Sequence, residues 1–198
     1  MAEEPDDLAL FALWRGGDAR AGSTLVRRHF DALHRFFSSK AQGQVEDLIQ
    51  QTFMACVEAR DAFRGESSFR AYLFGLARLQ LFSYYRKTQR ARTLDFTSTS
   101  VRDLGMSPTG VLAQREDERL LSLALHHVPV DQQIALELTY WEGLSASEVA
   151  RVLGIPENTV YSRLRRAKGH LRRALDTLSE QPDQRQRALE LLSDVGEE

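Results

Sequence analysis

The sequence predicts an all-α protein of two small helical domains joined by a flexible linker, the second a helix-turn-helix domain. Long stretches carry apolar residues at spacings of three and four, and none alternates convincingly as a strand would. A polar segment at residues 93–110 interrupts this pattern. The chain has 198 residues, 42% of them hydrophobic, so it can bury a substantial core.

The first domain, residues 1–92, is expected to contain four helices. Their approximate bounds are 8–14, 18–39, 44–63 and 67–90. Asp6 and Asp7 are candidate N-caps of the first helix, and Gly16 with Gly17 is expected to end it. The fourth helix has apolar residues spread too widely for one solvated face, so we expect it at the centre of the domain.

The linker, residues 93–110, contains the run Thr97–Ser100, then Gly105 and the pair Ser107–Pro108. A segment of this kind lacks the apolar periodicity needed to pack against a domain. We therefore expect the two domains to move relative to one another in the free protein. A protease is expected to cut this segment first.

The second domain, residues 111–176, is expected to open with a helical segment near residue 111. Three further helices are predicted at about 129–142, 145–153 and 156–178. The polar tail, residues 177–198, is predicted to add only a short helix near 184–192.

The segment 143–160 predicts the helix-turn-helix. Ser145 and Glu148 have the spacing of a capping box, which satisfies two amides at the start of a helix. Gly154 is expected to end that helix in the left-handed conformation, and Pro156 to open the next one where no amide donor is needed. In this motif the second helix enters the major groove of DNA.

The second helix of the motif has an apolar stripe and a basic side. The stripe consists of Val160, Leu164, Ala167 and Leu171. The candidate DNA-binding residues lie opposite: Thr159, Ser162, Arg163, Arg166 and Arg173. Arginine can bind guanine through two hydrogen bonds, which contributes ~1–3 kcal/mol of discrimination. The alternative is an ordinary helical hairpin with a solvated basic face, and it would require all these features to coincide by chance.

Composition limits the classes of protein. The formal net charge is −2, so affinity for nucleic acid must come from local basic clusters, at residues 86–92 and 163–173. Cys56 is the only cysteine, which excludes an internal disulfide and a cysteine-rich zinc site. The N-terminus is acidic, and no apolar run approaches the ~18 residues of a membrane span. We expect a cytoplasmic protein that does not insert into a membrane.

Catalysis is not expected. The five histidines show no metal-binding spacing with carboxylates. The sequence has neither a nucleotide-binding glycine loop nor a nucleophile motif. We therefore predict no catalytic residue, no metal and no cofactor.

Two groups of motifs resemble those of extracytoplasmic-function (ECF) sigma factors. In the second domain the matching segments are Glu142–Ser145, Leu153–Pro156 and Thr159–Leu164. In the first domain they are Glu46–Phe53 and Phe63–Leu73. Both groups occur in the order of the family, with a linker between them. The resemblance implies a sigma factor that binds core RNA polymerase and promoter DNA. Because a flexible linker would let a partner hold the domains in an inactive arrangement, we also expect an anti-sigma factor to bind.

The resemblance also implies roles for individual residues. The polymerase-binding candidates lie on the third helix: Asp47, Gln50, Gln51 and Phe53. Candidates for the minus-35 promoter element lie on the recognition helix: Tyr161, Ser162, Arg163 and Arg166. Thr159 and Arg173 remain DNA-binding candidates from the residue pattern alone. Candidates for the minus-10 element lie on the fourth helix: Arg78, Arg86, Lys87 and Arg90. Aromatic residues interleaved with these cations suit a single strand, because bases stack on aromatic faces at ~1–3 kcal/mol each.

Some parts of the chain depart from the family pattern. Leu79 replaces a usual asparagine, Ser83 a frequent aspartate, and Tyr161 a common basic residue. Gln51 replaces a frequent glutamate, which removes one charge from the polymerase-facing surface. The tail lies outside the resemblance, and its removal from Glu180 onward is expected to leave basal promoter binding largely intact.

A stand-alone regulator is the main alternative function. Such a protein would bind DNA through the same helix-turn-helix, and its first domain would sense a ligand or dimerise. The basic and aromatic fourth helix of the first domain argues against this, because a sensor domain does not need it. Specific binding to duplex DNA without core polymerase would favour the regulator.

Overall fold

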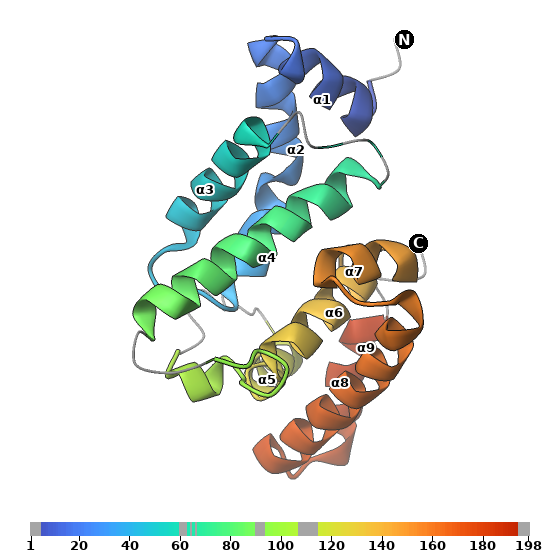
Figure 1. Ribbon diagram of the computed structural model, residues 1–198. Coiled ribbons are helices and arrows are strands. Elements are labelled where there is room, and N and C mark those ends of the chain that lie inside the picture. Colours follow the sequence, from blue (N-terminus) through green and yellow to red (C-terminus); the bar gives the residue numbers. More distant parts are fainter. Residues whose placement is uncertain are drawn as a thin grey trace.

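The computed structural model describes residues 5–59, 63, 65, 67–89, 94–106 and 115–193. Within these ranges the regular elements are helices, apart from one isolated β-bridge between Ser100 and Pro129. In chain order (Figure 1) they are α1 (Asp7–Arg15), α2 (Ala19–Ser38), α3 (Val45–Glu58), α4 (Phe69–Thr88), η1 (Arg102–Leu104), α5 (Glu116–Leu125), α6 (Val130–Tyr140), α7 (Ala146–Leu153), α8 (Glu157–Leu178) and α9 (Pro182–Ser193). Most of these bounds lie within two residues of the predicted helices, but α3 ends at Glu58 where the prediction ran to 63, and α5 begins at Glu116 where the prediction opened near 111.

Helix α4 lies at the centre of the molecule, as the sequence predicts for its domain. It contacts α1, α2 and α3 on one side and α7 of the second domain on the other (Figure 1). Its buried residues are spread around the helix: Phe69, Ala71, Leu73, Phe74, Ala77, Leu81, Phe82 and Tyr85. Few positions of α4 are therefore free to contact a partner.

The capping of α1 was predicted at two aspartates, and they have different roles. The carboxylate of Asp6 accepts a hydrogen bond from the Ala9 amide at 2.7 Å, which confirms Asp6 as the N-cap. Asp7 is the first residue of α1, and its carboxylate pairs with Arg28 and His29 of α2, each at 2.7 Å. Asp7 thus joins α1 to α2.

The tail belongs to the second domain. Helix α9 packs against α5, and Ala188 and Leu192 are buried in the same apolar cluster as Leu171 of α8. Arg187 of α9 also pairs with Asp117 of α5 at 3.0 Å. The sequence predicts a short helix here, but not its packing on the second domain, because only a few of its residues need to be apolar to cover α5.

The linker, residues 93–110, was predicted to be flexible, and its described part is instead packed. Phe96, Val101 and Leu104 are buried. The Phe96 ring stacks on Phe82 of α4 with 4.0 Å between centroids, and its carbonyl accepts a hydrogen bond from the Asp131 amide of α6. Three isolated apolar residues give no helical periodicity, yet they suffice to fix the segment against both domains. Residues 93 and 107–110 lie outside the described part.

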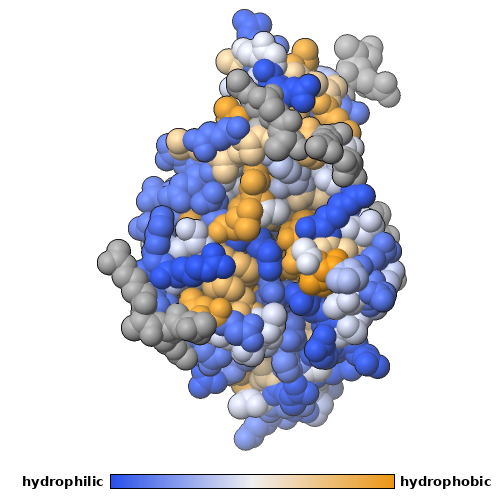
Figure 2. Space-filling view, viewed as in Figure 1, coloured by the Kyte–Doolittle hydropathy of each residue, from blue (hydrophilic) through white to orange (hydrophobic). Residues whose placement is uncertain are grey.

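The two domains form one continuous core. Leu138, Leu144, Val149 and Val152 of the second domain join the apolar cluster that includes α4. Hydrophobic residues gather in the middle of the molecular face over α4 and α7, while hydrophilic residues cover its lower part around α8 (Figure 2). The expected relative motion of the domains therefore requires this contact to open.

Candidate nucleic-acid and polymerase interfaces

The helix-turn-helix has the predicted local geometry. The Ser145 hydroxyl accepts a hydrogen bond from the Glu148 amide at 3.3 Å, and the Glu148 carboxylate accepts one from the Ser145 amide at 3.0 Å. Gly154 follows α7 with a φ of 66°, a conformation that favours glycine. Together these residues fix the angle at which α8 leaves the turn.

Helix α8 has the predicted buried stripe and an exposed side. Val160, Ala167 and Leu171 are fully buried, and Leu164, the fourth residue of the predicted stripe, is half-buried. Tyr161, Arg166 and Arg173 are exposed on the opposite side, and Tyr161 retains 62% of its accessible surface. Thr159 and Ser162 are half-buried, and the Ser162 hydroxyl donates to the Thr159 carbonyl at 2.9 Å. The exposed groups are those that DNA could reach in this conformation.

Arg163 is the exception among the predicted minus-35 residues. Its side chain keeps only 12% of its accessible surface and pairs with Asp131 of α6, with 3.2 Å between Nη1 and Oδ2. The other oxygen of the same carboxylate, Oδ1, accepts hydrogen bonds from Arg78 of α4, at 2.9 Å from Nη2 and 3.2 Å from Nε. One carboxylate thus binds an arginine from each of the two candidate DNA-binding helices.

The other predicted minus-10 cations lie at the C-terminal end of α4. Arg86 and Lys87 are exposed, and the Arg86 guanidinium lies 5.8 Å from the centroid of the Phe96 ring. Arg90 lies outside the described residues. Of the aromatic residues interleaved with these cations, Phe69, Phe82 and Tyr85 belong to the core, whereas Tyr72 and Tyr84 are half-buried. Leu79, one of the departures from the family pattern, is 58% exposed on α4.

The predicted polymerase surface lies on α3. Asp47, Gln50 and Gln51 are exposed, whereas Phe53 is only 8% exposed and belongs to the core. Beside them, an apolar hollow of about 400 Å³ lies between α3 and helices α1 and α2. Its lining residues are Trp14, Val26, Phe30, Glu46, Ile49, Gln50, Phe53, Met54 and Val57. The exposed apolar side chains here were not predicted, because Phe30 and Met54 fit a buried helical pattern equally well.

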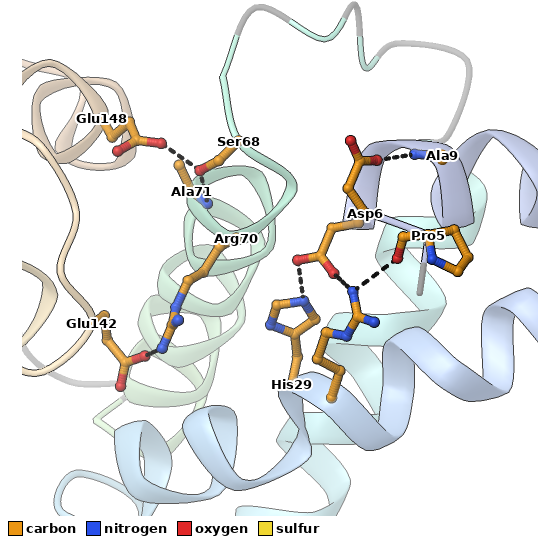
Figure 3. A network of polar contacts seen from close by, with 11 residues as sticks. Pro5, Asp6, Ala9, His29, Ser68, Arg70, Ala71, Glu142 and Glu148 are labelled. Atoms are coloured by element: carbon orange, nitrogen blue, oxygen red, sulfur yellow. Dashed lines mark hydrogen bonds and ion pairs between the residues drawn. The ribbon is translucent and has the colours of Figure 1, made fainter. Parts of the chain in front are cut away.

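The boundary between the domains carries polar contacts that the sequence does not predict. Arg70, on α4, binds Glu142 of the second domain, and Ser68, the N-cap of α4, donates to Glu148 of α7 (Figure 3). Burial alone would raise the pKa of Glu148, but hydrogen bonds from Ser68 and Ser145 lower it overall. Glu148 therefore links the N-termini of two helices from different domains. No local signal reveals such pairs, because the partners lie 72 and 80 residues apart.

A second part of this boundary is fully buried. Lys40, after α2, binds Glu137 of α6, and neither side chain is more than 4% exposed. Burial lowers the pKa of Lys40 and raises that of Glu137, while their mutual attraction opposes both shifts. Nearby, His126 is also buried, and burial together with the positive charge of Lys40 lowers its pKa to about 4. The uncharged form of His126 is therefore favoured in the folded protein.

Comparisons with known proteins identify the family. Residues 25–91 match Sigma-70 region 2, and residues 118–171 match Sigma-70, region 4. The ECF RNA polymerase sigma-E factor of Haemophilus influenzae is 30% identical over 183 residues, covering 85% of this chain and 94% of its own. This chain belongs to the ECF sigma factor family. As an ECF sigma factor, it directs RNA polymerase to particular promoters, and a stand-alone regulator is not favoured.

Other relatives agree with this assignment. The ECF sigma factor SigX of Bacillus subtilis is 29% identical over 151 residues, covering 74% of this chain and 78% of its own. The structure of CnrH in complex with the cytosolic domain of CnrY has a TM-score of 0.65 and 29% identity, with 88% of this chain and 99% of that chain covered. The sigma factor RpoE of Bartonella quintana, solved with the anti-sigma factor NepR, shares the fold, with a TM-score of 0.59 over 78% of this chain and 96% of its own at 24% identity.

Two further properties concern the described part of the chain alone. None of its helices is long and apolar enough to cross a membrane. None of its clusters of histidine, cysteine, aspartate and glutamate side chains could hold a metal ion.

Proposed function

We propose that this ECF sigma factor divides promoter recognition and polymerase binding among three helices. Helix α8 reads the minus-35 element, α4 contacts the minus-10 element, and α3 docks on core RNA polymerase. The observation that carries this assignment is the helix-turn-helix itself. Its capping box and glycine turn position α8, and α8 has a basic, solvent-exposed side.

On α8, we assign base contacts to the N-terminal half and phosphate contacts to the C-terminal half. Tyr161, Ser162, Arg163 and Arg166 lie within the first three turns, where side chains of a recognition helix reach base edges. Thr159 lies at the same N-terminal end of α8 and is proposed to contact DNA there. Arg173 lies further along the helix, where a phosphate is the nearer partner. The exposure of Arg166 and Arg173 supports both roles.

On α4, Arg78, Arg86 and Lys87 are proposed to contact the minus-10 region. Arg90, outside the described residues, is proposed for the same role. Tyr84 is only half-buried, so part of its ring is available for stacking on an unpaired base. The buried aromatic residues of α4 pack in the core and are not available for stacking on a base.

On α3, Asp47, Gln50 and Gln51 are proposed to touch core polymerase directly, while Phe53 supports them from the core. Substituting Asp47 by lysine in the otherwise unchanged chain should lower its affinity for core polymerase. Glu58→Lys makes the same change of charge on an exposed position at the end of the helix and serves as the control. Equal affinity of both folded variants would remove this part of α3 from the interface.

The remaining assignments follow from the same role. We propose that the protein acts in the cytoplasm, is not an enzyme, and binds an anti-sigma factor. The similarity to CnrH, solved with the cytosolic domain of CnrY, supports such a partner. The proposed units are residues 1–92, 93–110 and 111–176, with the tail 177–198 completing the last.

In vitro transcription with core polymerase across a promoter library tests the function as a whole. The chain should support transcription from a defined subset with shared minus-10 and minus-35 sequences. A gel shift without core polymerase distinguishes the sigma factor from a stand-alone regulator, because a regulator should bind specific duplex DNA on its own. Specific binding without polymerase, together with no transcription, would contradict the proposal.

A further inference from the structure

Tyr161 carries the most exposed large hydrophobic side chain in the described part of the chain. It keeps 62% of its accessible surface, and the next most exposed, Leu79, keeps 58%. Within the described residues the Tyr161 hydroxyl has no hydrogen-bond partner. Single exposed apolar residues are common on protein surfaces, so exposure alone assigns no role, and the place of Tyr161 in the fold decides it.

The position of Tyr161 on α8 directs its ring toward the N-terminal end of that helix. Tyr161 is the fifth residue of α8, at the start of the second turn. Its neighbour Val160 is fully buried, which fixes the rotation of the helix at this point. Side chains on an α-helix lean toward its N-terminus, and in a helix-turn-helix the N-terminal residues of the second helix contact base edges. The ring is therefore placed where a base edge lies when α8 occupies the groove.

The ring differs in chemistry from the exposed side chains around it. Glu157, one turn before, is acidic, while Arg165 and Arg166, about one turn after, are basic. Charged groups find partners on hydrogen-bonding base edges or on phosphates, whereas the Tyr161 ring offers an uncharged, apolar surface. Thymine alone presents a methyl group in the major groove, and aromatic side chains can contact it. Thymine is thus the base that this surface fits.

We propose that Tyr161 reads one thymine of the minus-35 element through contact between its ring and the C5 methyl group of the base. This inference rests on the proposed role of α8, and it adds which base one position of that helix selects. Burial of one methyl group corresponds to about fourfold in affinity. The contact uses the ring, so it does not need the hydroxyl.

Replacement of thymine by deoxyuridine tests the contact directly, because it removes the C5 methyl group and nothing else. The full-length chain is assembled with core polymerase, and footprinting locates the minus-35 element of a promoter that this holoenzyme transcribes. Each thymine of the element, on both strands, is then replaced in turn. One of these replacements should lower the affinity of the unchanged holoenzyme about fourfold.

Variants of Tyr161 show whether the ring causes that loss. Tyr161→Ala should bind the thymine and deoxyuridine promoters equally, whereas Tyr161→Phe should still prefer thymine by about fourfold. Leu178→Ala is the control, because Leu178 is exposed at the C-terminal end of the same helix and its loss should leave the preference unchanged. Tyr161→Arg should prefer guanine at this position, since arginine binds the O6 and N7 atoms of guanine.

The outcomes distinguish this inference from the proposed function. Absence of minus-35 protection by the unchanged holoenzyme would contradict the role of α8 itself. With protection present, the thymine contact is wrong if no deoxyuridine lowers the affinity, or if Tyr161→Ala retains the loss. Equal weakening of all sequences by Tyr161→Ala, with thymine and deoxyuridine alike, would show that the ring contacts the sugar–phosphate backbone and would also overturn it. Should Tyr161→Ala fail to fold, Tyr161→Arg replaces it in the deoxyuridine comparison, because it removes the ring as well.

Discussion

Helices α4 and α8 carry the two proposed DNA-binding surfaces, but they are built into the molecule differently. Helix α4 is buried around most of its circumference, whereas α8 buries one stripe and leaves its basic side exposed. A surface on α4 is therefore made from the few positions that packing leaves free. A surface on α8 can change with little effect on the core, so substitutions there separate function from stability more cleanly.

Interior substitution of α4 should have the largest effect. Phe74 is 1% exposed and packs against Phe36 at 5.5 Å between ring centroids. Phe74→Ala should lower the free energy of unfolding by ~3–5 kcal/mol, because it leaves a cavity in the core. Urea denaturation measures the change, with Leu79→Ala as the control. Leu79 is exposed on the same helix, so its loss should cost no more than about 0.5 kcal/mol. Similar losses for both would contradict the contrast between the sides of α4.

Removal of α9 tests how α8 is supported. Deleting residues 182–198 uncovers the cluster that contains Ala188, Leu192 and Leu171, and should destabilise the second domain by about 3 kcal/mol. The sequence predicts only that removal from Glu180 onward leaves basal promoter binding largely intact, and it predicts nothing about stability. Removing residues 194–198 alone leaves α9 complete and serves as the control. If thermal unfolding of the longer deletion matches that of the control, α9 does not support α8.

The helices and the turn were predictable because each depends on residues close together in the chain. The capping box, the left-handed Gly154 and the apolar stripe of α8 all follow from local spacing. The contacts between domains were not predictable. Asp131 and Arg78 are 53 residues apart, and nothing near either residue in the sequence identifies the other.

The linker is a second case in which local sequence does not predict a tertiary contact. Phe96 and Val101 have no periodic apolar neighbours, so the sequence predicts a flexible segment. Both side chains are nevertheless buried. Likewise, Arg163 has the position expected of a base-reading residue, and only the tertiary structure reveals that Asp131 binds it.

Acid should weaken the boundary between the regions that carry α4 and α8. His126 has a folded pKa of about 4 against about 6.5 when unfolded, so its stabilising contribution is complete above pH 6.5 and is lost as pH falls toward 4. Between pH 7 and pH 5 this loss should reach about 2 kcal/mol. Urea denaturation at both pH values should show a smaller decrease for His126→Gln than for His34→Gln, whose histidine is exposed on α2. An equal decrease in both variants would exclude His126 as the source.

Substitutions on the exposed side of α8 should affect DNA binding and leave stability nearly unchanged. Arg166 lies nearer the N-terminus of α8 than Arg173, and both side chains are exposed. Loss of a base contact penalises the correct site more than other sites. Arg166→Ala should therefore reduce binding to the cognate minus-35 element by ~1–3 kcal/mol and flatten the preference among variants of that element.

Arg173→Ala is the matched comparison on the same helix. Because phosphates are present at every site, it should weaken all sequences about equally and reduce the slope of log affinity against log salt by about one. Holoenzyme binding to a panel of minus-35 variants at several salt concentrations measures both properties. If the two variants give the same sequence preference and the same salt slope, base contacts and phosphate contacts are not divided between the two halves of α8. In that case the placement of its N-terminal half in the major groove is wrong, even though the chain remains an ECF sigma factor.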